Sequence, residues 1–306
     1  MPSGIILKGI GGFYYVSSED DIYECKARGI FRKDDVTPLT GDRVTFSVTD
    51  PMKKKGNIDG IMDRTTVLSR PAAANIDLLV VVIAAKSPEP DLLLLDKILV
   101  TAAKKGIEAV ICINKIDLDV DDNRAELRSS YIKAGYALIE TCLGESAGFG
   151  RLKETLKGHV SVFAGQSGVG KSTLLNRVAD TVIMRTGSIS GKIERGRHTT
   201  RHTELIKLSE DGYVVDTPGF SSFELAEITH TELEHLFPEF EDHKYKCRFT
   251  GCSHVNEPDC GVKEAVEQGS ISRGRYQRYT ELYAILKQEY DMKYKKNNRK
   301  GTRSND

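Results

Sequence analysis

Residues 111–119 read ICINKIDLD, an apolar run that leads into Asn114-Lys115-Ile116-Asp117. The run predicts a buried strand, and N-K-x-D is a motif that recognises guanine. In an ordinary GTPase this motif follows the phosphate-binding loop, whereas here that loop, GQSGVGKS at residues 165–172, comes later. Either the first match is only a polar turn after a strand, or one domain carries its motifs in a different order.

The phosphate-binding loop has the complete spacing G-x-x-x-x-G-K-S and lies between a predicted strand over 160–164 and a predicted helix over 171–179. Its glycines let backbone N–H groups close around phosphates, and the helix N-terminus adds its positive end. We expect Lys171 to reach the β- and γ-phosphates and Ser172 Oγ to ligate Mg²⁺. The alternative is a glycine-rich turn without a ligand. The predicted nucleotide-binding residues here are Gly165, Gln166, Ser167, Gly168, Val169, Gly170, Lys171, Ser172 and Thr173.

Two later stretches supply the remaining parts of a GTPase site. Asp216-Thr217-Pro218-Gly219 ends the apolar strand GYVVD, where Asp216 is expected to hold the Mg²⁺ shell and the Gly219 N–H to meet the γ-phosphate. The glycine-rich polar stretch 186–202 contains Gly196-Arg197-His198-Thr199-Thr200 and has the composition of a mobile switch loop. A threonine hydroxyl there would complete the Mg²⁺ shell, and we favour Thr200 over Thr199.

The base-recognition residues follow the ends of predicted strands, where open α/β sheets bind ligands. The Asp117 carboxylate can accept hydrogen bonds from guanine N1–H and the 2-amino group, and adenine offers neither donor there. We expect Lys115 to lay its stem along the base and Asn114 to reach N7 and tie this loop to the phosphate-binding loop. Thr141 and Cys142, at the end of a predicted strand over 137–141, fall where a second base-contacting loop belongs.

The predicted fold is multidomain. Short β-branched and aromatic runs separated by turns predict an all-β barrel, such as an OB-fold, over residues 1–70. Residues 71–223 alternate apolar strands with amphipathic helices, which predicts an α/β domain with a parallel sheet. Residues 224–306 read as mostly helical, with a last helix over about 273–290 and a disordered basic tail. The predicted α/β elements are strand 77–84, helix 91–105, strand 109–113, helix 122–135, strand 137–141, helix 149–157, strand 160–164 and helix 171–179.

The motif order along the α/β domain is base-recognition loop, phosphate-binding loop, first switch, second switch. Joining the usual ends of a GTPase domain and cutting after the second switch gives this order. Permutation of this kind is tolerated because domain termini lie at the surface and often close together. The sequence therefore predicts a circularly permuted GTPase domain.

Three cysteines and a histidine cluster near the C-terminus as Cys247-x₄-Cys252-x-His254-x₅-Cys260. Cys₃His is a structural zinc set, and four protein ligands leave no open position for catalysis. The alternative is a chance cluster of reduced thiols. The other cysteines, Cys25, Cys112 and Cys142, lie in or beside apolar strands and are interpreted as packing residues.

Composition places few limits on the partners. Lys plus Arg equals Asp plus Glu, 44 each, so only local charge is informative. No signal segment opens the chain, and the longest apolar run, residues 77–85, is far too short to span a bilayer, so we expect a cytoplasmic protein without a membrane partner. Local basic clusters are consistent with an RNA-binding platform or with a solvated surface. They comprise Lys26, Arg28, Arg32, Lys33 and Lys53–Lys55 in the barrel and Arg273, Arg275 and Arg278 in the last helix, where the stripe Tyr276, Tyr279, Leu282, Tyr283, Leu286 and Tyr290 is read as mostly core-facing.

Together the motifs TGDRV, NKID before GQSGVGKST, GRHTTRHTEL, DTPGF and the Cys/His cluster resemble the circularly permuted ribosome-biogenesis GTPases of the RsgA/YjeQ type. The resemblance runs nearly end to end. It implies an OB domain, a permuted GTPase domain and a zinc-binding domain. It also implies GTP and GDP as ligands with Mg²⁺, and binding to the small ribosomal subunit and its rRNA late in assembly, in company with other assembly factors. We expect a monomer whose GTP hydrolysis the subunit stimulates.

The residue after D-x-x-G is Phe220, where many small GTPases have a glutamine that orients the attacking water. Hydrolysis by the isolated protein should therefore be slow. The resemblance implies His198 as the residue that positions or activates water, which suits imidazole near neutral pH. His198 could instead pack or contact RNA.

Two other functions remain open at this stage. An ATP-dependent P-loop kinase or phosphotransferase is one, although N-K-x-D argues against it. An RNA-binding scaffold that holds GTP without hydrolysing it is the other. Because the second switch leads directly into the Cys/His region, we also expect loss of the γ-phosphate to move that region.

Overall fold

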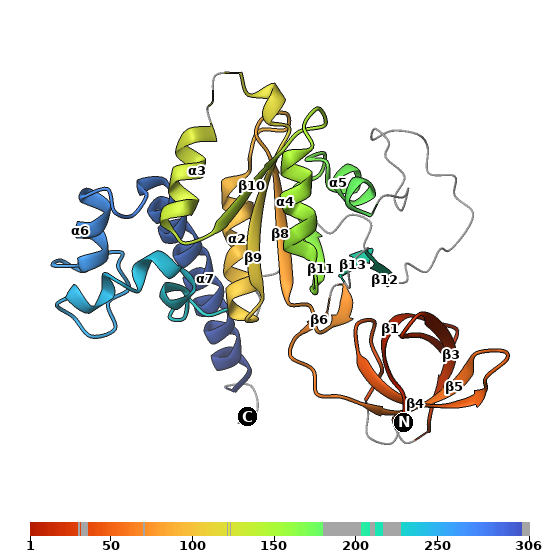
Figure 1. Ribbon diagram of the computed structural model, residues 1–306. Coiled ribbons are helices and arrows are strands. Elements are labelled where there is room, and N and C mark those ends of the chain that lie inside the picture. Colours follow the sequence, from red (N-terminus) through yellow and green to blue (C-terminus); the bar gives the residue numbers. More distant parts are fainter. Residues whose placement is uncertain are drawn as a thin grey trace, which may run out of the picture. The chain divides into compact units, whose positions relative to one another are not determined.

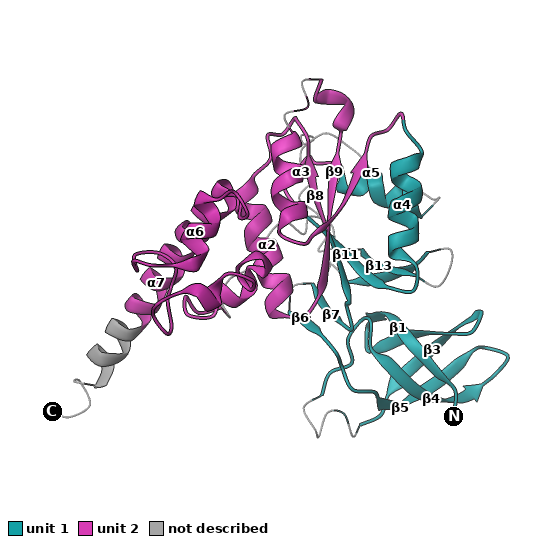
Figure 2. Ribbon diagram, turned by 60° about the vertical axis from the view of Figure 1, so that its left-hand side comes forward, with its two compact units in different colours: residues 1–80, 145–164, 170–220 teal, residues 81–144, 165–169, 221–306 magenta. Residues whose placement is uncertain are grey.

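The computed structural model describes residues 1–29, 31, 36–69, 71–120, 122, 124–179, 203–208, 212–216 and 228–301. The chain forms two compact units, coloured separately in Figure 2. Unit 1 comprises residues 1–80, 145–164 and 170–220, and unit 2 comprises residues 81–144, 165–169 and 221–306. The predicted division into domains 1–70, 71–223 and 224–306 stays a prediction.

Five strands at the start of unit 1 form the predicted barrel (Figure 1). Their order is β1-β2-β3-β5-β4, and β4 pairs with β1 to close the barrel. The alternating pattern of the strands places Ile6, Val16 and Phe46 inside, each fully buried. The strands are β1 (Ser3–Ile10), β2 (Phe13–Ser18), β3 (Asp21–Ala27), β4 (Arg43–Asp50) and β5 (Lys55–Ile61).

The sheet of unit 1 continues from the barrel into α/β structure. Strand β12 pairs antiparallel with β1 on one side and with β13 on the other, and β13 pairs parallel with β11. The parallel pair agrees with the predicted α/β domain, whereas β12 was not foreseen. The elements are β6 (Val67–Ser69), β7 (Ala72–Ala74), α4 (Ala147–Leu156), β11 (Val160–Ala164), α5 (Lys171–Val178), β12 (Glu204–Lys207) and β13 (Tyr213–Asp216).

Unit 2 begins with three strands in the order β10-β9-β8 and the helices α2 and α3. The Asp91 side chain accepts a hydrogen bond from the Leu94 N–H at 2.9 Å and so caps α2 at its predicted start. The elements are β8 (Leu78–Ala84, whose first residues belong to unit 1), α2 (Leu92–Lys104), β9 (Glu108–Asn114), the short 3₁₀ helix η1 (Ile116–Leu118), α3 (Arg124–Lys133) and β10 (Ala137–Thr141).

The C-terminal part of unit 2 is helical, as predicted. It contains η2 (Leu233–Leu236), η3 (Pro238–Phe240), η4 (Lys244–Lys246), α6 (Gly261–Glu267) and α7 (Arg273–Gly301). The expectation that the last helix ends near residue 290 was wrong, since α7 continues to Gly301. Residues 291–300 contain neither proline nor glycine, and their lysines and arginine are good helix formers that favour a helix C-terminus.

A single hydrophobic core joins this helical part to α2. Val100 of α2 packs in one cluster with Phe237, Phe240, Tyr279 and Leu282, all nearly inaccessible to solvent. The predicted core-facing stripe of α7 is confirmed for most of its residues, although Tyr290 is 49% exposed. None of the described helices combines the length and the apolar character that a membrane-spanning helix needs.

Candidate functional site

The first glycine of the phosphate-binding loop is required by close backbone packing. Gly165 follows β11 with φ +136°, and a Cβ there would lie 2.0 Å from the carbonyl oxygen of Val82 in β8. No side chain fits at that distance, so the loop can leave the strand in this direction only with glycine. Gly168, inside the loop, also has a positive φ of +82°.

Asn114 links the N-K-x-D motif to this loop, as expected from the sequence. Its buried side-chain amide donates a hydrogen bond to the Val169 carbonyl at 2.9 Å, across 55 positions of sequence. Its Oδ1 accepts a hydrogen bond from Thr141 Oγ1 at 3.0 Å. One buried amide therefore connects the ends of β9 and β10 with the phosphate-binding loop, which requires these segments to form together.

Lys115 makes the second connection. Its ammonium group donates to the carbonyls of Ser87 at 2.6 Å and Gly168 at 2.8 Å, while its backbone has the left-handed φ of 60°. That conformation disfavours a residue with a Cβ by about 1–2 kcal/mol, and the two hydrogen bonds offset it. Sequence reasoning missed Ser87, because a carbonyl acceptor carries no residue-type signal.

Asp117 lies in η1 with its side chain exposed, and its carboxylate bonds no other described residue. It is therefore available to accept hydrogen bonds from a ligand, and Ile116 beside it is half-buried. Thr141 and Cys142 are 1% and 8% exposed at the end of β10. Because both side chains point into the fold, a base could meet this loop mainly through its backbone.

The remaining phosphate and Mg²⁺ candidates belong to unit 1. Lys171 opens α5 directly after Gly170, and Ser172 and Thr173 follow half-buried in its first turn. Burial lowers the pKa of Lys171. Burial, followed by the charge of Glu204 opposite it in β12, raises the pKa of Asp216. Each shift acts against the charged form of its group, and bound phosphates and a divalent cation would act in the opposite direction. This donor set fits a Mg²⁺–nucleotide.

Several predicted residues lie outside the described part of the chain. Residues 180–202 include His198, Thr199 and Thr200, and residues 217–227 include Gly219 and Phe220. Their predicted roles stay predictions.

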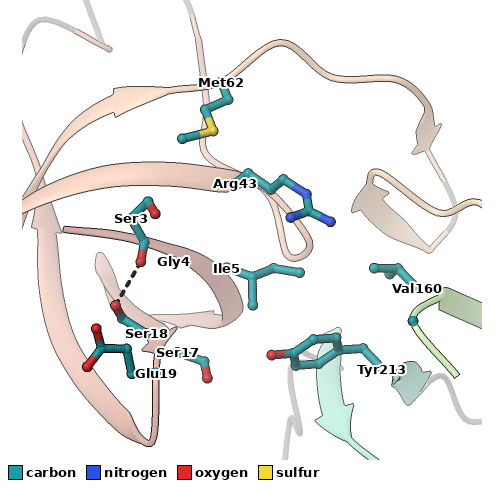
Figure 3. A pocket seen from close by; sticks show the side chains of 11 residues that line it. Ser3, Gly4, Ile5, Ser17, Ser18, Glu19, Arg43, Met62, Val160 and Tyr213 are labelled. Atoms are coloured by element: carbon teal, nitrogen blue, oxygen red, sulfur yellow. Dashed lines mark hydrogen bonds between the residues drawn. The ribbon is translucent and has the colours of Figure 1, made fainter. Parts of the chain in front are cut away.

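A pocket of about 280 Å³ in unit 1 lies away from all these residues (Figure 3). Val160 and Tyr213, which line it, begin β11 and β13, whereas the nucleotide motifs lie at the opposite ends of the same strands. Arg43 and Tyr213 reach into it from β4 and β13 (Figure 3). No predicted site residue contributes to this pocket.

The cysteine–histidine cluster in unit 2 has the dimensions of a tetrahedral metal site. One ligand atom from each of Cys247, Cys252, His254 and Cys260 lies within 4.8 Å of the others. The sulfurs of Cys247 and Cys260 are 3.8 Å apart, and His254 Nδ1 lies 3.3 Å from Cys260 Sγ. A tetrahedron built on Zn–S bonds of ~2.3 Å has edges of about 3.8 Å. The cluster could therefore hold a metal ion through His254 Nδ1.

Two of the thiols, Cys252 and Cys260, favour the neutral state in the metal-free protein. Burial, together with the neighbouring thiols, raises the pKa of Cys252 to about 12 and also raises that of Cys260. A bound cation would replace these protons, since thiolates are the ligands. Cys25, Cys112 and Cys142 are buried elsewhere in the fold, in agreement with packing roles.

The residues around the cluster hold its ligands in place. His254 Nε2 lies 2.8 Å from Glu234 Oε2, which fixes Nδ1 as the ring nitrogen that faces the thiols. The hydroxyls of Tyr276 and Tyr279 on α7 donate to the carbonyls of His254 and Ser253, each at 2.7 Å. Sequence reasoning missed Glu234, which lies 20 residues from His254 with no motif spacing.

Glu257 braces the loop between the second and fourth ligands. Its carboxylate accepts hydrogen bonds from the N–H and hydroxyl of Ser253 and from the Val255 N–H. Burial opposes ionisation, but these hydrogen bonds lower the pKa of Glu257 to about 2. The metal loop is therefore closed by its own side chains as well as by α7.

The assignment of Arg275 to a basic surface was wrong. Arg275 is 1% exposed and bonds Asp96 of α2 at 2.6 Å and Glu239 of η3 at 2.5 Å. Arg278 bonds the other oxygen of Asp96 at 2.5 Å. Burial acts against the charge, but Asp96 and Glu239 raise the pKa of Arg275. A sequence pattern shows a basic helix start but not the distant acids that make it an interior ion network.

Several barrel cations are also paired. Arg28 bonds Asp59 at 2.7 Å, Lys55 bonds Glu24 at 3.4 Å, and Lys54 pairs with Asp21. The pairs of Lys54 and Lys55 are accessible to solvent on both sides and contribute little to stability, whereas the side chain of Asp59 is only 8% exposed. They leave the barrel surface mixed in charge. Arg32 and Lys33 lie outside the described residues.

Comparison with known proteins gives one consistent family. The sequence profile described as RsgA GTPase matches residues 61–226, and the profile described as RsgA N-terminal domain matches residues 3–58. The small ribosomal subunit biogenesis GTPase RsgA of Ruminiclostridium cellulolyticum is 56% identical over 298 residues, covering 97% of each chain. The protein of the same name from Alkaliphilus metalliredigens is 48% identical over 287 residues, covering 94% of this chain and 98% of the relative.

Solved structures agree with these matches. The circularly permuted GTPase YloQ superimposes with a TM-score of 0.80 at 36% identity, covering 94% of this chain and 96% of YloQ. YjeQ from Thermotoga maritima gives a TM-score of 0.80 at 38% identity, covering 93% and 98%. The permuted motif order therefore occurs in a solved fold that matches this one nearly end to end.

Proposed function

The chain belongs to the RsgA GTPase family, and we propose that it binds the small ribosomal subunit late in assembly and hydrolyses GTP to GDP and phosphate with subunit-stimulated turnover. The observation that carries this proposal is the pair of hydrogen bonds from Asn114 and Lys115 to carbonyls of the phosphate-binding loop. They support one nucleotide site built from motifs in permuted order.

Guanine selection rests on Asp117. Its exposed carboxylate would accept from N1–H and the 2-amino group of guanine, and adenine presents no such donors. Lys115 keeps its ammonium group on the loop carbonyls, which leaves its aliphatic stem for the face of the base. Thr141 and Cys142 would complete the base pocket mainly through backbone groups.

Phosphate binding rests on residues 165–173. Backbone N–H groups and the N-terminus of α5 would surround the phosphates, with Lys171 on the β- and γ-oxygens. Ser172, Asp216 and Thr200 are the proposed Mg²⁺ ligands, and the Gly219 N–H would contact the γ-phosphate. Mg²⁺ supplies charge neutralisation when bound.

Turnover by the isolated protein should be slow, since Phe220 cannot orient water. His198 is the proposed residue that positions or activates the attacking water. A partner that places His198 beside the attacking water would therefore raise the rate of hydrolysis.

The metal cluster is proposed to be a structural zinc site. Its Cys₃His donor set and closed geometry suit Zn²⁺ without an open position. The barrel is the proposed rRNA-binding domain, and we propose that the protein acts in the cytoplasm as a monomer, alongside other assembly factors.

The test is phosphate release from GTP titrated with purified small ribosomal subunits, with large subunits and ATP as controls. We expect slow release from GTP alone, acceleration by small subunits only, and no release from ATP. Equal use of ATP and GTP would indicate a phosphotransferase-type site. GTP binding without phosphate release at any subunit concentration would indicate an RNA-binding scaffold.

A further inference from the structure

The sequence Thr40-Gly41-Asp42 has no part in the nucleotide or metal sites, yet it is buried and densely bonded. Thr40 is 7% exposed and Asp42 0% exposed. The Gly41 N–H donates to the Ile6 carbonyl at 2.8 Å, and the Ile6 N–H donates to the Asp42 carbonyl at 2.9 Å. The segment is therefore fastened to β1 of the barrel.

The Asp42 carboxylate fixes the shape of this turn. It accepts hydrogen bonds from Arg64 Nε at 2.7 Å and Arg64 Nη2 at 2.8 Å, and from the Leu39 N–H at 2.7 Å. A buried carboxylate bound in this two-point way holds its backbone in one conformation.

The same turn also contacts and bonds the segment that follows the barrel strands, at Ala74 and Asn75. Gly41 has φ +91°, and a Cβ there would lie 2.1 Å from the Ala74 carbonyl oxygen. The Asn75 amide donates to the Gly41 carbonyl at 3.0 Å, and the Ala74 N–H donates to the Thr40 carbonyl at 2.8 Å. The turn is thus held from both sides and has little freedom to adjust.

Thr40 then reaches a third segment. Its Oγ1 donates to the Thr203 carbonyl at 3.0 Å. The next residue, Glu204, pairs with Lys8 of β1 in the sheet and through a 2.7 Å ion pair. Thr203 is the first described residue after the stretch that carries the first switch, and β12 in turn pairs with β13, which ends at Asp216.

We propose that Thr40-Gly41-Asp42 is the positioning element through which the barrel sets the end of the first switch, with Thr40 as the positioning residue. The inference rests on the proposed function and deepens it. A partner shifts a conformational equilibrium only through contacts that differ between its states. The hydrogen bond from Thr40 to the Thr203 carbonyl would link a partner on the barrel to the chain segment that follows the switch.

The test uses the full-length chain and the variant Thr40→Val, which keeps the shape of the side chain and removes its hydroxyl. The readouts are kcat of subunit-stimulated GTP hydrolysis, the subunit concentration at half-maximal stimulation, and basal hydrolysis. We expect stimulated kcat to fall by roughly three- to tenfold, as loss of one hydrogen bond predicts, with the other two within about twofold. Thr40→Ser, which retains the hydroxyl, should restore kcat.

Thr45→Val is the matched control, because Thr45 is a half-buried barrel threonine whose hydroxyl bonds no described residue. Stimulation of Thr40→Val equal to wild type would overturn the inference alone. A raised half-maximal subunit concentration at unchanged kcat would also overturn it, since Thr40 would then serve only barrel binding. Absence of stimulation in the wild type would overturn the proposed function together with the inference.

A second set of variants covers the case in which Thr40→Val does not fold. Lys8→Glu should lower stimulated kcat, and adding Glu204→Lys should restore at least part of it by rebuilding the ion pair. No recovery in the double variant, with both proteins folded by circular dichroism, would contradict a connection through β1 and β12.

Discussion

A comparison of Gly165 with Gly135 distinguishes two reasons why a position favours glycine. Both have positive φ, but a Cβ at Gly135 would meet nothing within 4 Å, whereas at Gly165 it would meet a strand carbonyl at 2.0 Å. Gly135→Ala should cost only about 1–2 kcal/mol of unfolding free energy from its backbone conformation. Gly165→Ala must also displace the loop or β8.

We therefore predict that Gly165→Ala weakens binding of a fluorescent GTP analogue by at least about tenfold, whereas Gly135→Ala leaves it unchanged. Titration of both variants checks this, with thermal unfolding as a measure of their folding. Equal affinities would mean that the close approach to Val82 does not constrain the nucleotide loop.

Substitution of Glu234 tests the metal site at the scale of a single residue. Its carboxylate orients His254, so Glu234→Ala should speed transfer of the metal to a competing chelator by about 10–100-fold. Glu234→Gln, which keeps an acceptor oxygen, should lie between this variant and wild type. Glu241→Gln is the control, because Glu241 is exposed and pairs with Lys244 instead. Identical rates of metal release from the wild type and the three variants would show that Glu234 does not support the metal site.

At the scale of elements, α7 joins the metal loop to α2. Its first turns carry Arg275, which bonds Asp96, and Tyr276, which bonds the metal loop. Because the partners of Arg275 are buried acids, Arg275→Met should lower the unfolding free energy of unit 2 by about 3–5 kcal/mol. The control Arg273→Met removes an exposed cation from the same turn and should cost less than about 0.5 kcal/mol. Denaturant unfolding measures both, and similar losses would show that the ion network contributes no stability.

This packing also bears on movement of the Cys/His region. The region shares its core with α2 through Val100, and Lys104 of α2 bonds Glu232 at 2.5 Å. A change at the second switch would therefore have to move α2 and this region together. The movement of the Cys/His region expected on loss of the γ-phosphate stays a prediction.

Metal binding by the α6–α7 region should depend on pH with a definite sign. Burial raises the pKa of Cys252 to about 12, so the thiol is protonated in the metal-free protein at neutral pH. Metal binding must release that proton and the proton of Cys260, whose pKa is also raised, so apparent affinity rises with pH. We predict a gain of at least about two log units of affinity per pH unit between pH 6 and 8, one for each of these two thiols. Chelator competition across this range measures it, and a flat profile would contradict ligation by these thiols.

At the scale of the whole molecule, the sequence predicts what is local and misses what is distant. The spacing of apolar residues and the local composition predict a strand over 109–113, and β9 spans Glu108–Asn114. This prediction succeeds because the pattern of a buried strand or an amphipathic helix depends only on residues close together in the sequence. The motif order likewise gives the permuted GTPase fold. The glycines of the phosphate-binding loop, the N-K-x-D motif and the Cys/His spacing can all be recognised in the sequence, because each is a short pattern that indicates one kind of ligand.

The misses share a physical cause. The acidic residues that pair with the buried Arg275 lie 179 and 36 residues away in the sequence. Glu234, the partner of His254, is not part of the Cys/His motif. The strand β12, whose backbone joins the barrel to the sheet, is only four residues long and too short for a period to show. Such tertiary pairings depend on the assembled fold, so no local pattern predicts them.

The central claim is that the N-K-x-D motif and the phosphate-binding loop act on one nucleotide although their order is permuted. The most direct measurement is the affinity of Asp117→Asn for GTP and for xanthosine triphosphate, whose base replaces the 2-amino donor with an oxygen acceptor. We predict that GTP affinity falls by at least about tenfold and that xanthosine triphosphate becomes the preferred ligand, because an asparagine amide can donate to that oxygen. An unchanged preference for GTP in a folded Asp117→Asn protein would contradict the claim.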